Sequence, residues 1–193
     1  AMGRIAVVMI DGVADWEIGP VLPAAREWFG DEVAIASIDG QPVTSIGGLR
    51  IHPAHALSAF APLDADLWIL PGSERWQEGE IPALSSALRE RTGHGRAVAA
   101  ICGATLAFGR AGLLDARPHT SNSLEFLQYH LPGYAGAAHY RAQPTAVGEG
   151  GLITAAGSSP MSFALACLRQ LHPDKEDAIA EMRAMFAAEY AAA

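Results

Sequence analysis

The chain has 193 residues, half of them hydrophobic, and a formal net charge of −8 with only 13 lysines and arginines. This length supports one hydrophobic core and predicts a single domain over residues 1–193. The shortage of basic residues argues against a nucleic-acid partner. No apolar run is long enough to span a membrane and no signal-peptide pattern is visible, so we expect no membrane partner. Residues 1–3 precede the first expected strand and are interpreted as a cloning remnant without a role.

The two cysteines, Cys102 and Cys167, are too few for a disulfide framework, which predicts a reducing, cytoplasmic setting. No cluster of Cys, His and Asp has metal-ligand spacing, and no glycine-rich dinucleotide fingerprint follows the first strand. We therefore expect neither a metal nor a cofactor.

Strands and helices are expected to alternate along the chain. Buried strands are predicted by the apolar runs at residues 4–10, 32–38, 66–70 and 97–101. Helices are predicted at residues 15–30 with Asp15 as N-cap, and at 82–91, 124–129, 162–171 and 174–190. A small hairpin is expected from 42–44 and 49–51, a short strand at 119–121, and two short strands around a Gly-Gly turn within 146–155. This alternation predicts an α/β fold, a three-layer α/β/α sandwich with a mostly parallel central sheet.

Cys102 stands where the strand at 97–101 breaks into a helical pattern through Gly103 and Ala104. At such a turn the positive end of a helix dipole favours thiolate over thiol. It is also the strand–nucleophile–helix arrangement that other enzymes build with serine. The alternative is a small buried cysteine that serves packing alone.

The carboxyl ends of parallel strands share one edge of the sheet, and ligands bind there. Glu17, Gly72, Cys102, Asn122 and Gly157 all follow expected strands. An acid, a glycine turn and a thiol are thus predicted to converge, which favours a functional Cys102.

Three motifs at this edge resemble those of one protein family. They are Asp15-Trp16-Glu17, Leu70-Pro71-Gly72-Ser73 and Ala100-Ile101-Cys102-Gly103-Ala104. Together with the order of elements from residue 4 to about 171, they resemble the ThiJ/PfpI superfamily. It includes parkinsonism-associated deglycase-like proteins, PfpI peptidase-like proteins and isocyanide hydratases. The resemblance implies the flavodoxin-like sandwich shared with class I glutamine amidotransferases, and a homodimer.

The resemblance also implies roles for individual residues. Cys102 matches the family's elbow cysteine, and Glu17 matches an acid that bonds the sulfur in its protonated form. The N–H groups of Gly72 and Gly103 would then form an oxyanion hole. The plainer alternatives are a solvated first-turn glutamate at Glu17 and an ordinary turn glycine at Gly72.

The sequence departs from two branches of this family. Gly103 stands where the peptidase-like branch has histidine, and Asn122 where the deglycase-like branch has one. His119 or His139 could substitute, although each could equally be a packing or surface residue. Further pocket candidates are Trp16, which could instead belong to the core, and Ser73.

The function expected from these features is a cofactor-free hydrolase or lyase that uses Cys102 thiolate and Glu17. Its substrate would be a small electrophilic molecule, as in glyoxalase-like or deglycase-like chemistry or amide or isocyanide hydration. Without the usual histidine, we expect no peptidase activity. The alternative is a redox or stress-response protein, or a chaperone-like one, in which Cys102 is oxidised without turnover.

Overall fold

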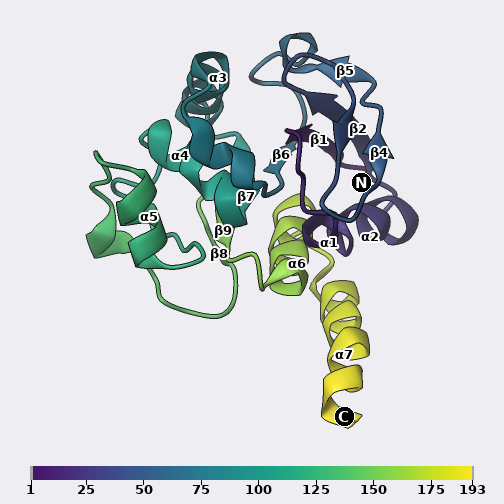
Figure 1. Ribbon diagram of the computed structural model, residues 1–193. Helices are drawn as coiled ribbons and strands as arrows, with labels where there is room; N and C mark the ends of the chain where they lie inside the picture. Colours follow the sequence, from purple (N-terminus) through teal and green to yellow (C-terminus); the bar gives the residue numbers. More distant parts are fainter. Residues whose placement is uncertain (1, 193) are drawn as a thin grey trace.

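A computed structural model describes residues 2–192, so Ala1 of the expected cloning remnant lies outside the described residues. Seven strands form one sheet in the order β5-β2-β1-β6-β7-β9-β8 (Figure 1). Their bounds are Arg4–Met9 (β1), Glu32–Ser37 (β2), His55–Ala56 (β5), Leu67–Leu70 (β6), Ala97–Ile101 (β7), Val147–Glu149 (β8) and Leu152–Ala155 (β9). All neighbours run parallel except β8 and β9. The predicted α/β class with a mostly parallel sheet is confirmed.

Helices cover both faces of the sheet. One layer contains α1 (Asp15–Ile18), α2 (Val21–Trp28), α6 (Pro160–Leu171) and α7 (Glu176–Ala192); the other contains α3 (Pro82–Gly93), α4 (Thr105–Arg110) and α5 (Leu124–His130). β7 is buried along its whole length because both layers pack on it. The side chains of Ala99 and Ile101 join the first core cluster and those of Val98 and Ala100 the second, as alternation along a strand requires. The carboxyl end of β7 is therefore held in place by packing on both faces of the sheet.

Three local expectations are corrected. The helix expected over 15–30 is interrupted at Gly19 and Pro20 and forms α1 and α2. Asp15 is not an N-cap: it is the first residue of α1, and its carboxylate accepts a hydrogen bond from the Ser45 hydroxyl at 2.7 Å. Residues 119–121 form no strand, only one bridge between His119 and Tyr140. The expected hairpin is present as β3 (Val43–Thr44) and β4 (Arg50–Ile51).

Gly3 is tied into the fold, contrary to the expectation for residues 1–3. It is buried, and its N–H donates to Asp31 Oδ1 at 2.8 Å. The same carboxylate lies 2.8 Å from Nε2 of His172, which is buried at the end of α6. Asp31 therefore links the start of the sheet to α6. Separately, no helix within residues 2–192 is long and apolar enough to cross a membrane.

Candidate active site around Cys102

Cys102 is one of two described residues other than glycine with a positive φ, at +61°. It follows β7 directly and begins a 3-10 turn (Cys102–Ala104) that continues into α4. A residue other than glycine in this region costs about 1–3 kcal/mol and persists only where its surroundings enforce it. One such restraint is the Thr105 hydroxyl, which donates to the Cys102 carbonyl at 2.8 Å. The strained turn holds the half-buried thiol at the carboxyl edge of the sheet.

Glu17 is placed beside Cys102 by α1, although 85 residues separate them along the chain. Its side chain is buried, and Oε1 accepts the N–H of Gly72 at 2.9 Å. Burial raises the pKa of Glu17 to about 7, although hydrogen bonds from Gly72 and Cys102 act in the opposite direction. Near neutral pH this carboxyl group can therefore either hold or accept a proton.

The thiol of Cys102 differs from the expectation of a lowered pKa. Burial, and next the negative charge of Glu17, raise its pKa, while hydrogen bonds from Asn122 and Gly103 lower it. The helix after the turn has only six residues, so its dipole does not offset desolvation. Cys102 and Glu17 are thus arranged so that the S–H group faces a carboxylate that can take its proton.

Asn122 contacts the sulfur from the open side of the site. Its Nδ2 donates to Cys102 Sγ at 3.3 Å, and its Oδ1 accepts the N–H of Gly157 at 2.9 Å. Because a backbone N–H can only donate, Gly157 fixes the amide with its NH₂ toward sulfur. Asn122 can stabilise a thiolate but cannot take its proton.

Neither of the two histidine candidates is placed to take the proton of Cys102. His119 is fully buried, and both ring nitrogens are engaged: Nδ1 lies 2.7 Å from the Arg117 carbonyl and Nε2 2.6 Å from the Tyr134 hydroxyl. Burial also lowers the pKa of His119. His139 is exposed in the 3-10 turn Ala137–His139, and within residues 2–192 no hydrogen bond joins it to Cys102.

Glycines keep the space around the thiol open. A Cβ on Gly157 would lie 2.8 Å from Cys102 Sγ and 3.0 Å from Glu17 Oε2, and a Cβ on Gly103 would lie 2.7 Å from the Ser73 carbonyl oxygen. A Cβ on Gly72 would crowd Glu17 and Cys102 equally closely. Because the N–H of Gly72 already donates to Glu17, a role for Gly72 in an oxyanion hole stays a prediction. The sequence placed Gly157 at this edge without indicating that it touches both reacting groups.

Gly157→Ala is expected to block the site while leaving the fold intact. The φ of Gly157 is not positive, so alanine fits the backbone, but its methyl group would occupy the space beside Sγ. Displacing a nucleophile by about 1 Å can cost about a hundredfold in rate, so alkylation of Cys102 should slow by a factor of that order. Gly133→Ala, where a Cβ meets nothing within 4 Å, is the matched control. Equal alkylation rates in the two variants would contradict the packing described.

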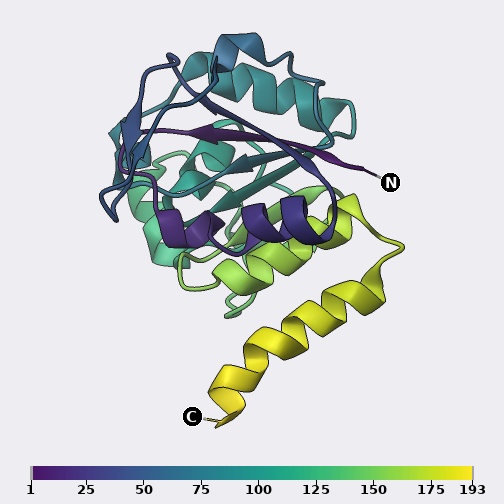
Figure 2. The same ribbon diagram turned by 90° about the vertical axis from the view of Figure 1, so that its right-hand side faces the viewer.

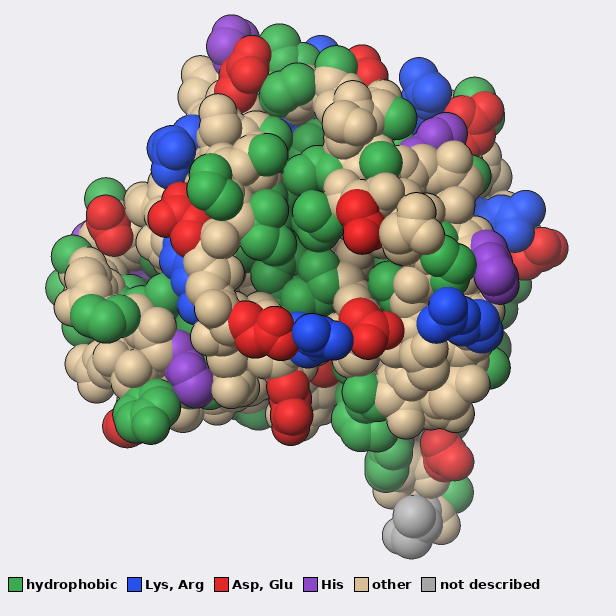
Figure 3. Space-filling view, turned by 45° about the horizontal axis from the view of Figure 1, so that its top comes forward, with side chains coloured by type: hydrophobic (Ala, Val, Ile, Leu, Met, Phe, Trp, Pro, Cys, Tyr) green, Lys and Arg blue, Asp and Glu red, His purple; other side chains and the backbone are tan. Residues whose placement is uncertain are grey.

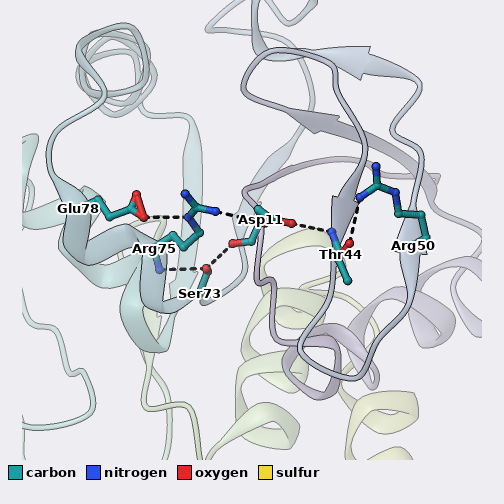
Figure 4. A network of polar contacts seen from close by, with 6 residues as sticks. All are labelled: Asp11, Thr44, Arg50, Ser73, Arg75 and Glu78. Atoms are coloured by element: carbon teal, nitrogen blue, oxygen red, sulfur yellow. Dashed lines mark hydrogen bonds and ion pairs between the residues drawn. The ribbon is translucent and has the colours of Figure 1, made fainter.

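Ser73 and Trp16 lie near the site but do not contact the sulfur through hydrogen bonds. The Ser73 hydroxyl donates to the Asp11 carbonyl at 2.6 Å and accepts the N–H of Arg75 at 3.1 Å. Ser73 thus joins a surface network in which Arg75 pairs with Asp11 and Glu78 (Figure 4). Trp16 is 64% exposed, which excludes its assignment to the core.

The larger hollows of the molecule lie away from the thiol. One of about 830 Å³ is lined at the amino ends of the strands, by Arg4 and Glu32 among others. Another of about 560 Å³ borders Asp11 and Arg75. Figure 3 shows a hollow with a hydrophobic floor and charged side chains along its edge. Among residues 2–192, no three His, Cys, Asp or Glu side chains are grouped so that they could hold a metal ion.

Comparisons with known proteins place the chain in a family. The DJ-1/PfpI family model matches residues 3–170. A DJ-1 superfamily protein from Agrobacterium tumefaciens, Atu0886, is 41% identical, with a TM-score of 0.89 over 98% of this chain and 100% of that one. A thiJ/pfpI family protein from Bacillus anthracis is 32% identical, with a TM-score of 0.76 over 89% and 84%. The Bacillus subtilis (strain 168) protein YoaZ, described as an uncharacterized protease, is 32% identical over 87% of this chain and 83% of its own. The chain belongs to the DJ-1/PfpI family.

Proposed function

We propose that the protein is a cofactor-free enzyme that adds the Cys102 sulfur to a small electrophilic carbon, with Glu17 as the proton-transfer group. The observation that carries the proposal is the pairing of a strained, half-buried thiol with a buried carboxyl group whose pKa is raised to about 7. A group that titrates near the working pH transfers protons most effectively in both directions. A reducing, cytoplasmic setting would keep Cys102 as a thiol.

The first step can be written from the residues present. The Glu17 carboxylate takes the S–H proton, the sulfur electron pair forms a bond to the carbonyl carbon, and the π pair of C=O moves to oxygen. The developing oxyanion takes the proton back from Glu17, which gives a neutral hemithioacetal and regenerates the carboxylate. The N–H of Gly103 and the Asn122 amide, both of which lower the pKa of Cys102, would also favour negative charge on the intermediates.

The size of the site favours small substrates. Gly157 and Gly72 leave room beside the sulfur only because they lack side chains, and Asn122 covers the open side. A peptide would have to bring an extended backbone into this restricted space, whereas an aldehyde, a primary amide or an isocyanide brings only a few atoms. This supports aldehydes, amides or isocyanides over peptides as substrates.

The proposal is tested by proton NMR with an α-ketoaldehyde, a primary amide and an isocyanide as separate substrates. We expect turnover of at least one of them, and loss of that turnover after one equivalent of iodoacetamide has alkylated Cys102. Cys167 will not compete for the reagent, because it is fully buried and burial raises its pKa. Complete alkylation of Cys102 with no turnover of any substrate by the unmodified protein would contradict the proposal.

A further inference from the structure

We propose that two buried hydroxyl groups, on Thr105 and Ser121, position Asn122 against the sulfur of Cys102. Thr105 is the first residue of α4 and is fully buried, and Ser121 is 3% exposed in the connection between α4 and α5. Their hydroxyl oxygens lie 2.7 Å apart. Within residues 2–192, neither hydroxyl is hydrogen-bonded to the sulfur, so both are positioning residues. The inference rests on the proposed function only in taking Cys102 as the reacting group.

The direction of the hydrogen bonds in this pair follows from the number of donors. A hydroxyl group has one proton to donate and two lone pairs that can accept. The Thr105 hydroxyl donates its proton to the Cys102 carbonyl at 2.8 Å. The Ser121 hydroxyl must therefore donate to Thr105 Oγ1. A chain of hydrogen bonds thus runs from Ser121 through Thr105 to the backbone of the strained turn.

Packing alone does not require hydroxyl groups at these two positions. The residues of α4 that follow Thr105 are apolar, and Leu106, Ala107 and Phe108 all belong to the second core cluster. A hydroxyl group buried among apolar side chains costs free energy unless it is hydrogen-bonded. Valine and alanine would fill nearly the same space without that requirement. The hydroxyls are instead bonded to each other and to the turn, which gives the contact a fixed direction.

Asn122 depends on this support because it is exposed and lies in neither a helix nor a strand. The Gly157 N–H, which donates to Asn122 Oδ1 at 2.9 Å, decides which end of the amide faces the sulfur. Ser121 is the residue directly before Asn122, so its contact with α4 fixes the backbone from which the amide extends. Ser121 thereby sets the distance of 3.3 Å from Asn122 Nδ2 to Cys102 Sγ.

The chemical consequence concerns the ionisation of the thiol. The hydrogen bond from Asn122 lowers the pKa of Cys102, against the larger effect of burial. Hydrogen bonds depend steeply on geometry, so a displaced amide stabilises the thiolate less. Loss of the contact between Thr105 and Ser121 should therefore raise the pKa of the thiol and reduce the fraction of reactive thiolate near neutral pH.

The test is the pH dependence of iodoacetamide alkylation of Cys102 in the full chain. We expect Ser121→Ala to slow alkylation at neutral pH by about three- to tenfold, the effect of one hydrogen bond, and to shift the profile to higher pH. The variant should keep its fold, because Thr105 still donates to the Cys102 carbonyl. The Tyr140 hydroxyl, which donates to the carbonyl of residue 121 at 3.3 Å, also still holds this connection.

Further variants separate positioning from a general structural effect. Thr105→Val should slow alkylation at least as much as Ser121→Ala, whereas Thr105→Ser, which keeps the hydroxyl, should stay close to the wild-type rate. In an Asn122→Ala background the effect of Ser121→Ala should largely disappear, because the residue through which it acts is gone. The matched control is Ser37→Ala, which removes a similarly buried and hydrogen-bonded hydroxyl at the end of β2.

Two results would overturn the proposal. The first is a pH profile of Ser121→Ala equal to that of Ser37→Ala. The second is an undiminished effect of Ser121→Ala in the Asn122→Ala background, since the two hydroxyls would then act on the turn at Cys102 directly. Alkylation needs no substrate, so a protein without turnover, which would contradict the proposed function, leaves this test intact.

Discussion

Cys102→Ser is expected to reduce turnover by more than about a thousandfold, the loss typical of removing a nucleophile that works together with a base. The serine hydroxyl is far harder to deprotonate than the thiol, so Glu17, with a pKa of about 7, cannot activate it to the same extent. The measurement is kcat/KM for whichever substrate the NMR experiment identifies. Circular dichroism checks that the variant keeps its fold.

Cys167→Ala is the matched control for this variant. Cys167 is buried inside α6, and the described structure gives it no hydrogen bond to the Cys102 site. We expect the control to retain kcat/KM within a factor of a few, although the small cavity can lower its melting temperature. Turnover by Cys102→Ser close to that of the control would contradict nucleophilic catalysis by Cys102.

Most of the fold was predictable because its signals are local. Each buried strand is a short apolar run, and β1, β2, β6 and β7 begin and end within one residue of the expected bounds. The break between α1 and α2 was missed because the apolar pattern continues across Gly19 and Pro20, although Pro20 provides no N–H for a continuous helix. The strand expected at 119–121 reflected β propensity that tertiary contacts override, because His119 pairs only with Tyr140.

The proximity of Glu17 and Asn122 to Cys102 could be predicted from the sequence, but the positions of His119 and His139 and the electrostatics of the thiol could not. The motifs placed Glu17 and Cys102 at one edge of the sheet because strand order alone brings them there. The pKa of the Cys102 thiol was predicted to be lowered, which is wrong: burial, and next the charge of Glu17, raise it. Both effects depend on residues that are distant along the chain. The contact of Gly157 with the sulfur depends on the loop after β9, whose path has no sequence signal.

The surroundings of α7 could not be predicted from the sequence either. Its alanine, glutamate and methionine content predicts a helix, and the helix forms. Whether its apolar side is covered depends on the direction in which the chain leaves α6, which the composition of α7 does not encode. Only the structure shows that residues 183–192 of α7 are exposed and that this half of the helix projects away from the sheet (Figure 2).

Glu17→Gln is expected to remove a pH-dependent loss of stability. The pKa of Glu17 is raised from 4.5 to about 7 by burial, so the folded protein binds this proton more tightly than the unfolded chain does. The carboxyl group therefore contributes its full stability below about pH 4.5, and this contribution falls as the pH rises towards 7. A shift of this size corresponds to about 3 kcal/mol. The difference in unfolding free energy between variant and wild type should accordingly move in favour of glutamine from pH 4.5 to 7.

The same substitution should separate the reactivity of the thiol from turnover. Removing the negative charge of Glu17 lowers the pKa of Cys102, so alkylation at neutral pH should become faster than in the wild type. Glutamine cannot take up or return a proton, however, so turnover should fall by about a hundredfold or more. Glu125→Gln, at an exposed position on α5, is the control for both measurements. Slower alkylation in Glu17→Gln would mean that protonated Glu17 stabilises the thiolate more than its charge opposes it, and the proton would then reside on the carboxyl group before substrate arrives.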